Sequence, residues 1–155
     1  MDIFPLAQAV QSLNADDAWR VRLSADQWRV LAQYLTRHEI LPGDLLVKQG
    51  DTDRTVYLLE QGTMQVFATG NSPAGHRLAI LRPGAVVGEP GLFGDATRMA
   101  NVEAMTRCAV WALRGPRFEE LAQRVPALAI ELLRSLGGVM AARMRANLAR
   151  QVPVT

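Results

Sequence analysis

The fold of this chain is decided by a glycine-punctuated stretch at residues 41–70, which reads LPGDLLVKQGDTDRTVYLLEQGTMQVFATG. Short runs of aliphatic and β-branched residues alternate here with turns of the Pro-Gly-Asp, Gln-Gly-Asp and Gln-Gly kinds. We interpret the runs at 45–48, 56–60 and 63–68 as strands, and we expect the last two to form a hairpin at the centre of a sheet.

The same pattern continues on both sides of this stretch. Further strands are predicted at 39–41, 77–81, 85–87, 101–105 and 108–113. Helical periodicity predicts helices at 4–13, from the capping-box residue Ser24 to Leu35, at 117–123 and at 126–149. Many short strands with regular turns predict a mainly β fold, a sandwich, jelly roll or barrel, with flanking helices.

Composition narrows the class of protein. The chain has 155 residues, of which 49% are hydrophobic and 21% charged, as in a globular domain that buries its own core. No apolar run reaches the length of a membrane span, and the N-terminus lacks the basic segment of a secretory signal. One cysteine and two histidines argue against a disulfide and a metal site. We therefore expect a cytoplasmic protein without membrane partners or metal.

Charge is unevenly distributed along the chain. Residues 1–97 carry 8 basic and 11 acidic side chains, whereas residues 98–155 carry 9 basic and 4 acidic ones. The basic part is short and the net charge is only +2, so nucleic acid is not the expected partner.

One segment has the residues of a small anion site. Residues 88–104 read GEPGLFGDATRMANVEA. The glycines permit close backbone approach, a short helix start presents N–H groups, and Arg98 supplies a guanidinium that can grip two phosphate oxygens. Glu89 is suited to accept from a ligand hydroxyl. From spacing alone, however, Glu89 and Arg98 could equally form a surface ion pair.

This segment resembles the phosphate-binding cassette of cyclic nucleotide-binding domains. Such domains occur in regulatory subunits of cAMP-dependent protein kinase, in cyclic nucleotide-gated channels and in the bacterial catabolite activator protein family. The Gly-Glu to Arg-x-Ala spacing fits the kinase and channel type without a gap. The resemblance extends over residues 25–148 through four turn motifs and the terminal helix. The motifs are Leu41–Asp44, Gln49–Asp51, Tyr57–Gly62 and Leu81–Gly84.

The resemblance implies a double-stranded β-helix, or jelly-roll, fold and a ligand site. Glu89 would accept from the ribose 2′-hydroxyl, and Arg98 would pair with the cyclic phosphate of cAMP or cGMP. Asn101 stands where many members have Thr or Ser near the base. The implied ligand-binding set is Gly88, Glu89, Gly91, Leu92, Arg98, Met99, Ala100 and Asn101.

The resemblance also implies a domain organisation. We expect an N-terminal helical extension at 1–24, a cyclic nucleotide-binding domain at 25–149 and a tail at 150–155. Within the domain, a β-roll at about 38–113 would precede C-terminal helices at about 116–149. The last helix would close over the base, which makes Met140, Arg143, Met144 and Asn147 lid candidates; plain packing or a solvated surface is the alternative for each of them.

The last helix has a second interpretation. Apolar residues recur along it at intervals of three and four, which suits either a dimer seam or core packing. They are Ala129, Leu133, Leu136, Met140 and Met144. Gly137 and Gly138 in its middle permit a bend or a close helix approach.

Three hypotheses follow for function. The first is a cyclic-nucleotide sensor without an effector domain of its own, which signals through its last helix to an unidentified effector protein or a second copy. The second is a ligand-free interaction module of the same fold. The third is a truncated relative of a DNA-binding regulator.

Other residue types point to packing and not to chemistry. No nucleophile triad or carboxylate pair supports an enzyme, and no cofactor is expected. Cys108 and the three tryptophans, Trp19, Trp28 and Trp111, are expected in the core, and His76 on the surface.

Overall fold

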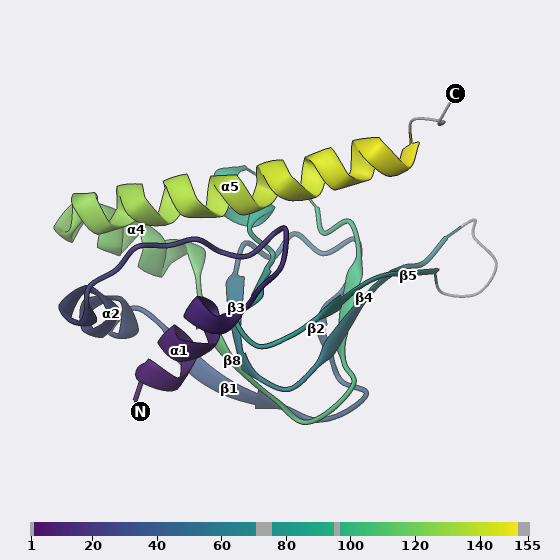
Figure 1. Cartoon of the computed structure of the whole chain (residues 1–155), viewed down its shortest axis with the longest axis horizontal. Coiled ribbons are helices and arrows are strands. Elements are labelled where there is room, and N and C mark those ends of the chain that lie inside the picture. The colour runs from purple at the N-terminus through teal and green to yellow at the C-terminus, as the bar shows by residue number, and fades with distance from the viewer. Residues whose placement is uncertain (1, 71–75, 95–96, 152–155) are drawn as a thin grey trace.

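The chain folds into two four-stranded antiparallel sheets that face each other, with helices packed around them (Figure 1). The computed structural model describes residues 2–70, 76–94 and 97–151. One sheet has the order β1 (Thr36–Ile40), β8 (Cys108–Leu113), β3 (Val56–Gln61) and β6 (Val86–Val87). The other has the order β2 (Leu45–Val47), β7 (Asn101–Ala104), β4 (Met64–Ala68) and β5 (His76–Leu81). The predicted mainly β fold with flanking helices is confirmed.

Strand β8 is buried along its whole length because both of its faces are covered. Side chains alternate between the faces of a strand. Cys108 and Val110 therefore join the cluster between the sheets, and Trp111 and Leu113 join the cluster beneath the helices. The predicted core position of Cys108 is confirmed, since only 1% of it is exposed.

The predicted hairpin between residues 56–60 and 63–68 is wrong. Strand β3 pairs with β6 and β8, whereas β4 pairs with β5 and β7 in the opposite sheet. The intervening chain bonds to the β7–β8 connection instead of closing on itself: the Thr63 N–H donates to Oγ1 of Thr106, and the Met105 N–H donates to the Thr63 carbonyl. Gly62 therefore marks a corner between the sheets.

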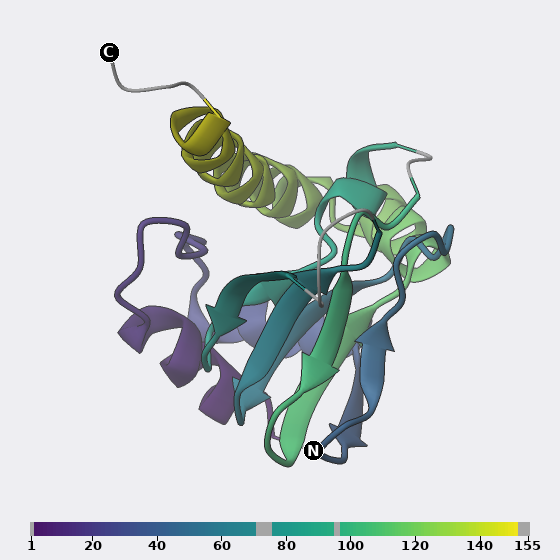
Figure 2. The same ribbon diagram turned by 90° about the vertical axis from the view of Figure 1, so that its right-hand side faces the viewer.

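Four helices pack against the sheet that contains β3 and β8, namely α1 (Phe4–Ser12), α2 (Ala25–Ala32), α4 (Gly115–Arg124) and α5 (Pro126–Gln151). The predicted capping box is formed: the Gln27 N–H donates to Oγ of Ser24, and the Gln27 side chain accepts from the Ser24 N–H. Figure 2 shows α1 at one side of the strands and α5 across their upper end. Trp19 and Trp28 meet edge to face in this helical layer, with ring centroids 5.9 Å apart.

The segment between α1 and α2 lies along α5. Figure 1 shows it rising from α1 and running back beneath α5 toward α2. The Trp19 indole donates to Oγ of Ser135 at 2.7 Å, and the Arg22 N–H donates to a carboxylate oxygen of Glu131 at 2.9 Å. From Trp19 to Arg22 the residue numbers of the segment rise, whereas those of the partners in α5 fall from Ser135 to Glu131. The segment and α5 therefore run antiparallel.

Helix α5 is continuous and passes through Gly137 and Gly138 without interruption. It continues two residues beyond the predicted end at 149, and residues 152–155 of the predicted tail lie outside the described residues. Residues 71–75, between β4 and β5, also lie outside them. None of the helices in the described ranges combines the length and hydropathy needed to cross a membrane.

Candidate functional site

The segment 88–101 is positioned beneath α5 by a single helical turn, α3 (Pro90–Phe93). Pro90 occupies the first turn, where a missing N–H costs nothing. The Phe93 ring reaches α5, because a Cβ built on Gly137 would lie 3.9 Å from it. Leu92 is buried in the helical cluster. Within the segment, residues 95–96 are outside the described ranges.

The Arg98 side chain is buried, with 6% of its surface exposed. Its guanidinium donates to the carbonyl of Thr55 at 2.6 Å and to the carbonyl of Gly88 at 3.1 Å. The Nε–H is buried without a hydrogen-bond partner in the part of the chain that the structure describes. Arg98 therefore places a positive charge and an unused donor inside the segment.

Backbone hydrogen bonds join Arg98 to the Gln-Gly-Asp turn. The Arg98 N–H donates to the Asp51 carbonyl at 2.7 Å, and the Gly50 N–H donates to the Arg98 carbonyl at 2.9 Å. Gly88 has φ of +80°, and a Cβ there would lie 2.3 Å from a guanidinium nitrogen of Arg98. Gly88 thus permits the approach of Arg98, which explains why the segment needs glycine at this position.

Within the part of the chain that the structure describes, the carboxylate of Asp53 faces Arg98. Asp53 Oδ2 lies 3.5 Å from the Arg98 guanidinium, and Asp53 Oδ1 accepts from both the N–H and the hydroxyl of Thr55. Burial alone would raise the pKa of Asp53, but these hydrogen bonds and the charge of Arg98 outweigh it and lower the pKa. Burial, together with the Asp53 charge, raises the pKa of the neighbouring Tyr57 hydroxyl.

Glu89 is buried, with 4% of its side chain exposed, and it pairs with the last helix. Its Oε2 accepts from Nη1 of Arg143 at 2.8 Å. Among the described residues Glu89 thus pairs with Arg143 and Arg98 with Asp53, so the simple Glu89–Arg98 surface pair is not what forms here.

Arg143 joins three segments of the chain. Besides Glu89, its guanidinium donates to Oδ2 of Asp17 at 2.9 Å and to the carbonyl of Val86 at 2.8 Å. Burial would lower the pKa of Arg143, but the two carboxylates outweigh it and raise the pKa further. Arg143 is one of the four lid candidates predicted from the sequence. The sequence does not identify Asp17 and Asp53 as site residues, because nothing in their local sequence distinguishes them from ordinary surface carboxylates.

The other predicted site residues are placed differently. The Gly91 N–H donates to the Gly88 carbonyl within α3. Asn101 is buried, and its side-chain oxygen accepts from the Gln49 N–H at 2.9 Å. Met99 is 87% exposed and Ala100 is half-buried. Of the lid candidates, Met140 is half-buried, and Met144 and Asn147 are exposed.

Comparisons with known proteins identify the family to which this fold belongs. A family model described as "Cyclic nucleotide-binding domain" matches residues 37–125. The chain is 31% identical over 117 residues to a cGMP-dependent protein kinase of Drosophila melanogaster, covering 76% of this chain and 10% of the kinase. It spans about a fifth of the length of matching mycobacterial proteins.

Solved structures share the fold. The catabolite activator protein of Thermus thermophilus superposes with a TM-score of 0.71 at 27% identity, covering 83% of this chain and 59% of that one. A cyclic nucleotide-binding domain from Methylobacillus flagellatus superposes with a TM-score of 0.83 at 18% identity, covering 99% and 85%. With the family match over more than half of the chain, these findings show that the protein belongs to the cyclic nucleotide-binding domain family.

Proposed function

We propose that the chain is a regulatory module that binds a cyclic nucleotide, cAMP or cGMP, with its phosphate at Arg98 and its ribose at Glu89. The observation that carries this proposal is the buried guanidinium of Arg98, whose Nε–H has no partner among the described residues. A buried donor without an acceptor is costly, and a phosphate oxygen would satisfy it.

The charges around Arg98 also support an anion. Among the described residues its side-chain hydrogen bonds go to neutral carbonyls, and the carboxylate that faces it there, that of Asp53, is 3.5 Å away and 45% exposed. A cyclic phosphate carries a single negative charge, which suits a guanidinium that is only partly neutralised. One relative is named a cGMP-dependent protein kinase and another, from Thermus thermophilus, a cyclic AMP receptor protein, so cGMP and cAMP are the probes to use first.

Calorimetric titration tests this proposal. We expect cAMP or cGMP to bind the wild-type protein, and Arg98→Lys to weaken that binding by about 10- to 100-fold, since one charge-assisted hydrogen bond contributes about 1.5–3 kcal/mol. Cyclic di-GMP serves as a third probe, since a larger cyclic nucleotide also carries phosphate.

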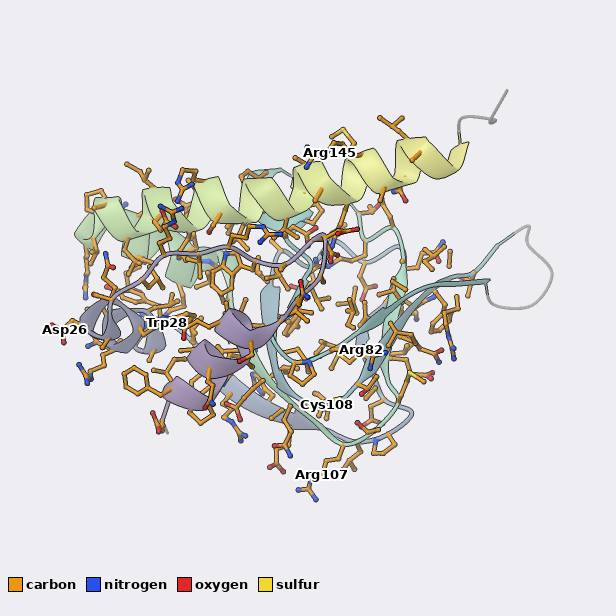
Figure 3. All side chains as sticks on the ribbon, in the orientation of Figure 1. Asp26, Trp28, Arg82, Arg107, Cys108 and Arg145 are labelled. Carbon is orange, nitrogen blue, oxygen red and sulfur yellow. The ribbon has the colours of Figure 1, made fainter. Side chains whose placement is uncertain are left out.

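The control variant is Arg107→Lys. Arg107 is 68% exposed and pairs with Glu39, and Figure 3 labels it on the side of the molecule opposite α5. The Arg107→Lys variant should bind nucleotide like the wild type, and circular dichroism should show that both variants are folded. If folded wild-type protein, freed of carried-over ligand, gives no heat with any of the three nucleotides, the ligand-free interaction module becomes the better description.

We propose α5 as the output of the module, toward an effector protein or a second copy of the chain. Apolar side chains remain exposed on it at heptad-like spacing: Ile130 is 64% exposed, Met144 58% and Leu148 53%. Light scattering coupled to gel filtration tests self-association. We expect a dimer that Met144→Glu converts to monomer; a wild-type monomer at all concentrations would leave the effector protein as the partner.

A further inference from the structure

The segment 13–23, here called the strap, is attached to α5 at three places. The first two are the bonds from Arg22 to Glu131 and from Trp19 to Ser135, described above. The third is the ion pair between Asp17 and Arg143, which lies two helical turns beyond Ser135. The strap therefore follows α5 over about three turns. It ends where α5 meets the segment 88–101, which is called the cassette below.

Arg143 is the residue at which strap, helix and cassette meet. Its guanidinium holds a carboxylate of the strap, a carboxylate of the cassette and the carbonyl of Val86 in β6. The Arg143 side chain is 28% exposed, whereas that of Glu89 is 4% exposed. Arg143 thus covers the carboxylate that a ribose hydroxyl would need.

We propose that Arg143 is a clasp between the strap and the cassette, and that the 2′-hydroxyl of a bound nucleotide opens it by replacing Arg143 at Glu89. This inference rests on the proposed function, because it names the regulation of the same site. It adds the N-terminal strap, and not the last helix alone, to the part of the molecule that responds to ligand.

Burial and charge explain why Glu89 would not bind Arg143 and the 2′-hydroxyl at the same time. A hydroxyl that donates to Glu89 must come within about 2.5–3.0 Å of a carboxylate oxygen. Because that carboxylate is almost fully covered and the guanidinium lies 2.8 Å from its Oε2, a hydroxyl that takes the place on Oε2 has to displace Arg143. Arg143 then loses one of its two carboxylates, and the pair with the half-exposed Asp17 alone is weak.

Hydrogen exchange measured by NMR without nucleotide tests the clasp itself. The Ala18 N–H, which donates to the Ala15 carbonyl at 3.1 Å, reports on the strap, and the amides of residues 140–147 report on the end of α5. We expect Asp17→Asn and Arg143→Lys each to accelerate exchange at both places by about fivefold or more, because each weakens a charge-assisted hydrogen bond.

Each of the two substitutions has a matched control within two residues of it in the sequence. Asp16→Asn and Arg145→Lys make the same chemical changes at exposed positions, and Figure 3 labels Arg145 on the outer side of α5. Both should exchange like the wild type. Asp17→Asn removes only a partly exposed charge, so it keeps the test valid if Arg143→Lys fails to fold. If Asp17→Asn exchanges no faster than Asp16→Asn, the clasp is refuted.

Hydrogen exchange in the presence of nucleotide then tests whether ligand binding opens the clasp. We expect saturating cAMP or cGMP to accelerate exchange of the Ala18 N–H in the wild type, and the matching 2′-deoxy nucleotide to bind without doing so. A bound ribonucleotide that leaves Ala18 unchanged, or a deoxy nucleotide that accelerates it equally, overturns the proposal while the proposed function stands.

Failure of the two proposals can be told apart. If neither cAMP nor cGMP binds, the proposed function fails and opening by nucleotide fails with it. The exchange rates without nucleotide still report whether Arg143 links strap and cassette, because no ligand is needed for that measurement.

Discussion

Gly62 directs the chain from one sheet to the other through its backbone. Its φ is +98°, and a Cβ built on it would lie 2.5 Å from the carbonyl oxygen of Arg107 and 2.9 Å from the Cα of Cys108. A Cβ at this corner must therefore displace backbone as well as the Sγ of Cys108, which would lie 2.6 Å away.

We predict that Gly62→Ala lowers the free energy of unfolding by more than about 2 kcal/mol, from backbone strain and overpacking together. Gly43→Ala is the comparison, because Gly43 also has positive φ, +89°, with no atom within 4 Å of a Cβ. It should lose only the strain, about 1 kcal/mol. Urea unfolding measures both, and equal losses would show that the close contact at Gly62 is relieved without cost.

Asp53 makes stability depend on pH in a definite direction. Its pKa is lowered in the folded protein, so its contribution is present above the unfolded-state pKa of about 3.9 and is lost as pH falls through the lower folded value. We predict that wild type is more stable than Asp53→Asn at pH 7 and that the difference shrinks below about pH 4. Urea midpoints at the two pH values check this; a constant difference would contradict it.

At the scale of elements, α5 is a single helix despite two adjacent glycines. Gly138 is exposed, and no atom lies within 4 Å of a Cβ built on it. We predict that Gly138→Ala raises the free energy of unfolding by about 0.5–1 kcal/mol, because alanine loses less backbone entropy than glycine in a helix. Thermal unfolding measures the gain. A loss of stability would show that α5 bends at this position in solution.

The strap and α5 are joined in the core by one buried hydrogen bond. The Trp19 indole is 3% exposed and Ser135 is 7% exposed, and the hydroxyl of Ser135 is the acceptor for the indole N–H. At the scale of the whole molecule, this bond ties the N-terminal part of the chain to the last helix across 116 residues.

We predict that Ser135→Ala costs about 1–3 kcal/mol of stability, because it leaves the Trp19 N–H buried without an acceptor. The control is a double-mutant cycle with Trp19→Phe, in which the serine should matter less once the indole N–H is gone. Chemical unfolding of the four proteins gives the coupling. Strict additivity would mean that the hydrogen bond does not contribute to stability.

Much of the molecule could be predicted from local sequence. The strands around the Gln-Gly-Asp and Gln-Gly turns, the capping box at Ser24 and the buried tryptophans follow from propensity, periodicity and turn chemistry, which act over a few residues. The segment 88–101 is identified instead by its resemblance to the phosphate-binding cassette of a known family, because spacing alone leaves a surface ion pair between Glu89 and Arg98 open.

Partners that are distant in sequence could not be predicted. Hydrophobic patterning indicates that 56–60 and 63–68 are strands, but it does not indicate which strands they pair with. The chain between them bonds through Thr63 to the β7–β8 connection, and β3 and β4 join opposite sheets. Likewise, charge in the sequence does not reveal which of many arginines meets a given carboxylate. Only packing brings Asp17 and Glu89 to the same guanidinium, Arg143.

The sequence by itself thus determined a mainly β fold with flanking helices, because turn chemistry and periodicity act over a few residues. It located the segment 88–101 through resemblance to a known family. The tertiary structure alone decided what the charged groups of the cassette contact: Arg98 meets two carbonyls and Asp53, and Glu89 meets Arg143. Burial makes these pairings specific, since a charge removed from water is stable only beside the partner that the fold provides.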